Sequence, residues 1–173
     1  MDKKGYFFIL DAFLALGILV MGVFLLLSSY TRTPEKEQTA NIAEDLLDFF
    51  ANTKIEDFNN LYFGASGTLV QQGFIKDAQK TLLQQLGEFY VNNDLDRAEN
   101  LITNVTQDLI PFQYKYEFLI DKTRIHPKNP SQQFLISKEN AKVLFPSKKL
   151  SFGTINETLD LFGPYKVEVL VWR

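Results

Sequence analysis

The opening segment MDKKGYFFILDAFLALGILVMGVFLLLSSY (residues 1–30) decides how the rest of the chain is arranged. No charge occurs from Ala12 to Leu27, and the wider apolar run approaches the roughly 20 residues that a helix needs to cross a bilayer. Inside lipid the backbone must satisfy its own hydrogen bonds, so a helix is expected there. Lys3 and Lys4 precede the run and a polar remainder follows it. The positive-inside rule therefore predicts a cytoplasmic N-terminus and a domain outside the membrane.

The residues in front of the apolar run are more distinctive than those behind it. A removable secretory signal ends in a small-x-small cleavage motif, and residues 27–30, Leu-Ser-Ser-Tyr, fit that pattern poorly. The basic pair Lys3-Lys4, followed by Gly5 and an aromatic-aliphatic segment from Tyr6, resembles the class III (type IV prepilin) signal. This resemblance implies that a prepilin peptidase recognises Lys3, Lys4, Gly5 and Tyr6. It would cut between Gly5 and Tyr6, and the hydrophobic helix would be retained.

One acid, Asp11, interrupts the start of the apolar run. An ionisable residue inside a membrane helix usually marks a function. The resemblance implies that Asp11 neutralises the new N-terminal amine of a neighbouring subunit, although the family usually has Glu as the fifth mature residue and Asp11 would be the sixth. The alternative is a protonated or snorkelling Asp near the helix end. Ala12, Ala15 and Gly22 share one helix face, and small residues favour close approach of helices during subunit assembly.

Composition limits what the rest of the chain can be. The chain has 173 residues, a net charge of -3 and no Cys. About 140 residues remain after the anchor, which is enough for one ordinary domain. The mild charge does not suggest a nucleic-acid partner. Without Cys there are no disulfides and no thiolate metal sites, so the domain depends on core packing, to which 16 Phe and 7 Tyr contribute.

Helical periodicity predicts three segments after residue 30. The first is an amphipathic helix at about 34–52, with Thr33 as N-cap and Pro34 at the first helical position, or with Pro34 as a kink in one continuous helix. Residues 53–72 are expected to be a loop. Two helices follow, the first from Ile75 with its apolar stripe at residues 82–90 and the second from Leu95 to about Ile110, separated by the stop-and-cap signal Asn92-Asn93-Asp94. The solvent-facing positions expected of the first are Gln79, Lys80, Gln84, Gln85 and Glu88.

After Pro111 the pattern changes to a period of two. Phe112, Tyr114, Tyr116, Phe118 and Ile120 alternate with polar residues, among them Glu117, which indicates a half-buried strand. Residues 121–130 are expected to form a turn. Further strands are expected at 133–137, 142–145, 149–152 and 165–173. The sequence therefore predicts an α+β fold: a long N-terminal transmembrane and amphipathic helix, and two further helices packed on an antiparallel sheet of about four strands.

The whole arrangement resembles the pilin-like proteins of archaea. The resemblance is carried by KKGYFFILDAFLALGILV (3–20), NLITNVTQDLIP (100–111) running into YKYEFLID (114–121), and GPYKVEVLVWR (163–173). It implies a cytoplasmic leader (1–5), a transmembrane and filament-core helix (6–30) and an extracellular pilin-like head (31–173). The function it implies is that of a major or minor structural subunit of a type IV pilus-like surface filament. Its partners would be like subunits or other pilins, the prepilin peptidase, the assembly platform and the membrane.

An alternative from a different class is an unprocessed single-pass surface protein that acts as a binding or filament-assembly factor. Retention of Lys3-Lys4-Gly5 in the mature protein would favour it. An anchored enzyme is the least expected class, because no HExxH, GxSxG or phosphate-loop motif occurs. The single His, His126, is expected in a solvated turn. We expect no catalytic, cofactor or metal site.

Two N-glycosylation sequons would lie outside the membrane under this topology. They are Asn104-Val105-Thr106, within a predicted helix, and Asn156-Glu157-Thr158.

Overall fold

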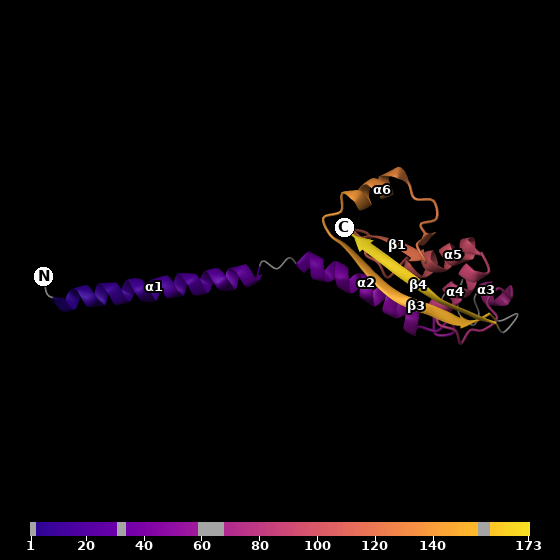
Figure 1. Ribbon diagram of the computed structural model, residues 1–173, viewed down its shortest axis with the longest axis horizontal. Coiled ribbons are helices and arrows are strands. Elements are labelled where there is room, and N and C mark those ends of the chain that lie inside the picture. Colours follow the sequence, from indigo (N-terminus) through magenta and orange to yellow (C-terminus); the bar gives the residue numbers. More distant parts are fainter. Residues whose placement is uncertain (1–2, 31–33, 59–67, 156–159) are drawn as a thin grey trace. The chain divides into compact units, whose positions relative to one another are not determined.

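The computed structural model describes residues 3–30, 34–58, 68–155 and 160–173. The chain divides into two compact units, Met1–Pro34 and Glu35–Arg173. The first contains the apolar helix α1 (Lys3–Tyr30). The second, which we call the head, combines helices with a four-stranded antiparallel sheet (Figure 1). The α+β class predicted from the sequence is confirmed.

Helix α2 (Pro34–Asn52) is the amphipathic helix that the periodicity predicts. Pro34 is its first helical residue, a position where no intrahelical bond requires the missing N–H. Thr33, the expected N-cap, lies outside the described residues. Leu46 and Phe50 are buried as expected, and the apolar face is completed by Ala43 and Leu47.

Helices α4 (Leu82–Val91) and α5 (Leu95–Thr106) follow a four-residue helix, α3 (Thr68–Gln71). A capping box starts α4: Thr81 Oγ1 accepts a hydrogen bond from Gln84 N at 3.2 Å, and Thr81 N donates to Gln84 Oε1 at 3.0 Å. Residues 92–94 end α4 and begin α5, as the sequence predicts. Asn93 takes a left-handed φ of 57°, and Asp94 accepts a hydrogen bond from the backbone N of Arg97 at 3.4 Å.

The end of α5 and the start of the first strand differ from the sequence prediction. The helix ends at Thr106, before the expected Ile110, and a turn in which Leu109 N and Ile110 N both donate to Thr106 O leads into Pro111. Leu109, expected in the apolar stripe, is 45% exposed. Phe112 is 92% exposed, because the strand begins only at residue 115.

The sheet has four strands in the order β2-β1-β4-β3, with every neighbouring pair antiparallel. The strands are β1 (Lys115–Ile120), β2 (Thr123–His126), β3 (Leu144–Thr154) and β4 (Leu161–Trp172). Of two predicted strands, 149–152 lies within the single strand β3 and 142–145 overlaps its start at Leu144. Strand β2 lies where only a turn was expected, and forms a hairpin with β1 through Asp121 and Lys122, which have φ of 45° and 72°.

The segment expected as a strand at 133–137 is helical instead. It belongs to α6 (Gln132–Glu139). Ser131 caps this helix by accepting a hydrogen bond from Phe134 N at 3.2 Å. The expectation of two further helices therefore misses α6 as well as the short α3.

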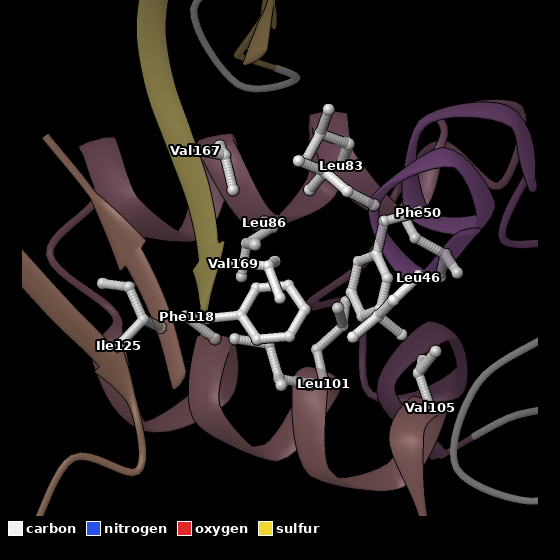
Figure 2. Close-up of a cluster of buried hydrophobic side chains, with 14 of the residues drawn as sticks. Leu46, Phe50, Leu83, Leu86, Leu101, Val105, Phe118, Ile125, Val167 and Val169 are labelled. Carbon is white, nitrogen blue, oxygen red and sulfur yellow. The ribbon is translucent and has the colours of Figure 1, made fainter. Parts of the chain in front are cut away.

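The core lies between one face of the sheet and helices α2, α4 and α5. Figure 2 shows side chains from these helices gathered against Phe118 of β1 and Val169 of β4. The rings of Phe50 and Phe118 lie 5.1 Å apart, which joins α2 to the central part of the sheet. At the edge of the sheet, Lys149 of β3 forms an ion pair with Asp48 of α2.

Helix α6 packs on the opposite face of the sheet, near the end of β4. Trp172 is 1% exposed, because its ring lies 4.9 Å from that of Phe134 and its Nε1 donates to Ser137 Oγ at 3.2 Å. Glu117 on β1 is fully buried and forms ion pairs with Arg124 of β2 and Lys138 of α6. The expectation that Glu117 faces solvent is therefore wrong, because α6 covers that position.

A second correction concerns α4. Lys80, Gln85 and Glu88 were expected to face solvent but are 5%, 1% and 6% exposed. Lys80 Nζ lies 2.7 Å from Glu88 Oε2 and also donates to the carbonyl of Thr154. The α4 helix is covered on a second side by the end of β3, so its polar stripe carries a buried ion pair.

Candidate functional site

Helix α1 has the length and composition of a membrane-spanning segment. Its 28 residues include the stretch Ile9–Leu27, with a mean hydropathy of 2.6. Nineteen residues at about 1.5 Å rise span about 28 Å, close to the thickness of a hydrocarbon core of about 30 Å. Every side chain of this stretch is exposed within the chain. The structure therefore contains one N-terminal helix that is long and apolar enough to cross a membrane.

The residues expected to act in assembly all lie on this helix. Asp11 is the only charged residue of the stretch, and lies in the N-terminal half of α1. Ala12, Ala15 and Gly22 follow at helical spacing and share one face. A Cβ added at Gly22 would meet no atom within 4 Å, so this face has room for a close neighbour. Their roles in assembly remain predictions.

The expected cleavage site lies at the beginning of the same helix. Lys3, Lys4, Gly5 and Tyr6 are its first four residues, while Met1 and Asp2 lie outside the described residues. Cleavage would remove the first helical residues and leave the apolar stretch intact.

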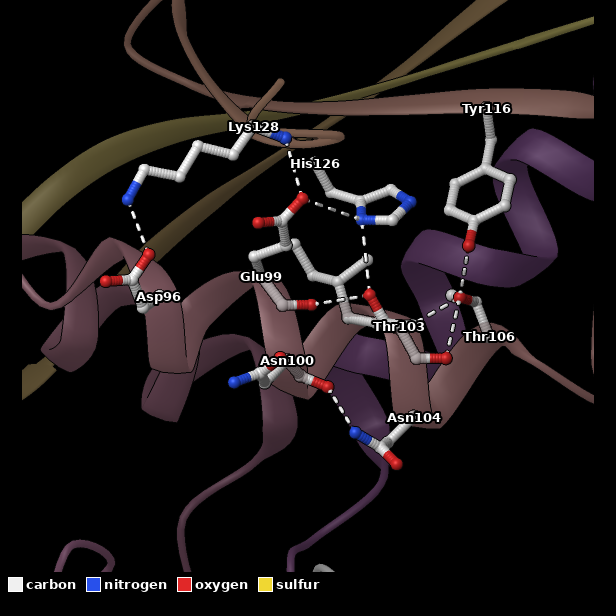
Figure 3. Close-up of polar contacts among 10 residues, drawn as sticks. Asp96, Glu99, Asn100, Thr103, Asn104, Thr106, Tyr116, His126 and Lys128 are labelled. Carbon is white, nitrogen blue, oxygen red and sulfur yellow. Dashed lines mark hydrogen bonds and ion pairs between the residues drawn. The ribbon is translucent and has the colours of Figure 1, made fainter. Parts of the chain in front are cut away.

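Only one of the two sequons lies in the described part of the chain. Asn104 lies on α5, half-buried, and its Nδ2 donates to Asn100 O at 2.8 Å (Figure 3). The amide that a glycan would modify is thus engaged along the helix. Asn156 lies outside the described residues.

The expectation that His126 lies in a solvated turn is wrong. This residue lies at the end of β2, against α5. Its side chain is 15% exposed and stacks on Tyr116, with the ring centroids 4.9 Å apart. Burial lowers the pKa of His126 below its usual 6.5, and Glu99, whose Oε1 lies 3.8 Å from Nδ1, partly opposes this shift. Figure 3 shows Thr103 on the same side, with its Oγ1 3.4 Å from Nδ1.

This cluster does not have the geometry of a catalytic triad. A triad needs the nucleophile on one imidazole nitrogen and the acid on the other, whereas Thr103 and Glu99 both approach Nδ1 of His126. The Thr103 hydroxyl donates to Glu99 O at 2.9 Å.

The surrounding polar contacts connect α5 to the strands of the hairpin. Lys128 N donates to Glu99 Oε1 at 2.7 Å, and the Lys128 ammonium forms an ion pair with Asp96. The hydrogen bond from the Lys128 ammonium to the Asp96 carboxylate raises the pKa of Lys128. The hydroxyls of Tyr116 and Thr106 lie 2.6 Å apart, and burial raises the pKa of Tyr116. The contacts are those of a structural link between α5 and the β1–β2 hairpin.

A polar recess of about 360 Å³ lies beside α4 and the start of α5. The two acids in its lining are already paired, Glu88 with Lys80 and Asp94 with Arg97. Gln85 also lines it, and neither atom of its buried amide has a hydrogen-bond partner in the described chain. Within the described residues, no group of three or more His, Asp or Glu side chains is placed to hold a metal ion.

No protein-family model matches this chain, and no curated protein or solved structure shows a significant similarity to it.

Proposed function

We propose that this chain is a structural subunit of a type IV pilus-like cell-surface filament, assembled through α1. The observation that carries the proposal is the combination of two separate units. One is a helix whose 19-residue apolar stretch exposes every side chain, and the other is a head with its own core. Such a helix must be surrounded by lipid or by other apolar helices, because water would contact its whole apolar surface.

Filament assembly would replace the lipid around α1 with the α1 helices of other subunits. Helices associate in an apolar medium through close packing, which small residues allow. Ala12, Ala15 and Gly22 supply such a face. Asp11 is costly in lipid, and a neighbouring positive charge would compensate it. Cleavage before Tyr6 creates that charge as a new N-terminal amine, five residues from Asp11 along the chain.

The proposal is tested by the N-terminal residue of the mature protein, isolated from its native membrane and identified by intact mass and terminal sequencing. A start at Tyr6 is expected. Retention of Met1 with Lys3 and Lys4 would reject prepilin-type processing and leave a permanently anchored binding or assembly factor.

A pair of matched variants sharpens this test. Gly5→Val alters the residue at the expected cleavage site, and should leave Met1 in place and prevent filament formation. Gly17→Val makes the same change further along α1, where an added Cβ meets no atom within 4 Å, and should be processed normally. Normal filaments from Gly5→Val would contradict the proposal.

A further inference from the structure

An apolar groove lies on the head between α2 and the turn that follows α5. It encloses about 220 Å³. Its lining comes from Ile42, Asp45, Leu46 and Phe49 of α2 and from Leu109 and Ile110 of the turn. Asp45 is the only charged residue of this lining, and it is exposed. The groove thus has apolar walls and one negative charge.

An aromatic side chain protrudes from the same turn. Phe112, two residues after Ile110, is 92% exposed, the largest exposed fraction among the large apolar side chains described. Almost its whole ring contacts water, although burial of such a ring is favourable. Leu109 in the same segment is 45% exposed, so two large apolar side chains face water here.

The charges beside the ring and in the groove are complementary. Lys115 lies three residues after Phe112, so the Cα atoms of these two residues are at most about 10 Å apart. Lys115 and Asp45 are both exposed, and neither forms an ion pair with another described residue. A partner chain that presents a ring and, three residues further along, a cation would supply an occupant for the groove and a counter-charge for Asp45.

We propose that the groove binds Phe112 of a second copy of this chain, with Lys115 of that copy beside Asp45. Each copy carries both the ring and the groove, so one type of contact can join successive copies or be made reciprocally by two. The inference rests on the proposed function in one respect: anchoring through α1 concentrates the copies in one plane. The contact can then form with less buried area than the roughly 1,600 Å² of a stable interface between free proteins.

The absence of Cys from the chain allows a direct test by cross-linking. Full-length Asp45→Cys and Lys115→Cys chains, carrying different tags, are produced together in the native membrane and oxidised with copper phenanthroline. We expect a disulfide-linked dimer that carries both tags, several-fold more abundant than the dimer formed by either variant alone. Unchanged Trp172 fluorescence establishes that both variants are folded.

Matched aromatic substitutions separate the ring from general surface effects. Phe112→Ser, made in the Lys115→Cys chain, should reduce the mixed dimer several-fold. Phe152→Ser removes another exposed ring, 62% exposed on β3, and should leave the yield unchanged. The proposal is overturned if no mixed dimer forms, if single variants dimerise equally well, or if Phe112→Ser has no effect. Capture of a different protein by Asp45→Cys in place of the mixed dimer would also overturn it.

Failure of this contact is distinguishable from failure of the proposed function. A mature start at Tyr6 with normal filaments but no mixed dimer would reject the contact alone. A mixed dimer from chains that retain Met1 would support the contact and reject the processing.

Discussion

Replacement of Lys80 by Met should destabilise the head by about 3–5 kcal/mol, the usual cost of removing one partner from a buried ion pair. Lys80 and Glu88 are 5% and 6% exposed, and Lys80 Nζ lies 2.7 Å from Glu88 Oε2. Their charges are therefore poorly screened by water. The variant leaves the Glu88 carboxylate without this ammonium and also removes the hydrogen bond that Thr154 O accepts. A domain has about 5–15 kcal/mol of stability in total, so the loss is a large fraction of it.

The single Trp of the chain provides the assay. Trp172 is 1% exposed in the head, so its fluorescence reports unfolding of the head whatever the state of α1. Urea unfolding of the full-length protein in detergent should show a midpoint lowered by about 2 M, for a loss of about 4 kcal/mol and a slope of about 2 kcal/mol per M. Lys142→Met is the control, an exposed Lys whose replacement should cost less than about 0.5 kcal/mol.

A double variant tests the reason for the effect. Lys80→Met combined with Glu88→Gln removes both charges, and should recover a substantial part of the lost stability, since the buried Glu88 carboxylate is removed together with the ammonium that lies beside it. The reasoning is refuted if Lys80→Met behaves like Lys142→Met. It is equally refuted if the double variant is no more stable than Lys80→Met.

Three further predictions concern the head and α1. Gly87→Ala would place a Cβ 2.5 Å from Phe162 Cε2, and should lower the urea-unfolding free energy by about 1–3 kcal/mol; an unchanged midpoint would contradict the packing. Because burial holds the pKa of His126 below 6.5, the unfolded state takes up the proton first, and stability should fall as pH drops below about 6.5. His126→Phe, which keeps a ring against Tyr116, should reduce that slope in urea midpoints measured from pH 5 to 8. Leu19→Lys places a charge in the middle of α1 at a cost of about 2.5–3.5 kcal/mol and should abolish membrane insertion or filaments, whereas Leu19→Ile should not; normal filaments from Leu19→Lys would contradict assembly through α1.

The strands that alternate strictly could be predicted because one face of the sheet is buried. In β4, Val167, Val169 and Val171 are fully buried and alternate with the partly exposed Lys166 and Glu168. Burial of one face imposes a period of two on the sequence, and that period is visible without any tertiary information.

The α6 segment could not be predicted in the same way. Phe134, Leu135 and Ile136 form a continuous apolar run, which fits a strand or a helix equally well. The local signal that decides it is Ser131, whose side chain caps the backbone N–H of Phe134. That signal is short and shares its residue type with many turns.

Buried charges escaped prediction because they depend on elements distant in the sequence. Alternation correctly places Glu117 opposite Phe118, on the face of the sheet away from the core. Only the packing of α6, through Lys138, turns that face into a buried one. The same limit applies to the candidate site: α1 is evident from composition, whereas Leu109 and Phe112 were expected in the core. Leu109 lines a surface groove instead, and Phe112 is exposed.

The position of β4 has a consequence for the order in which the head can fold. Of the described elements it is the last to be synthesised, yet it lies between β1 and β3 and pairs with both. Until β4 has been synthesised, only β1 and β2 can pair with each other. The pairings of β4 with β1 and with β3 cannot form before then. A chain that enters the membrane by its N-terminal helix would keep its sheet open throughout passage to the outside. Under the proposed function, the head would close only when β4 emerges, so folding of the sheet would follow the completion of export.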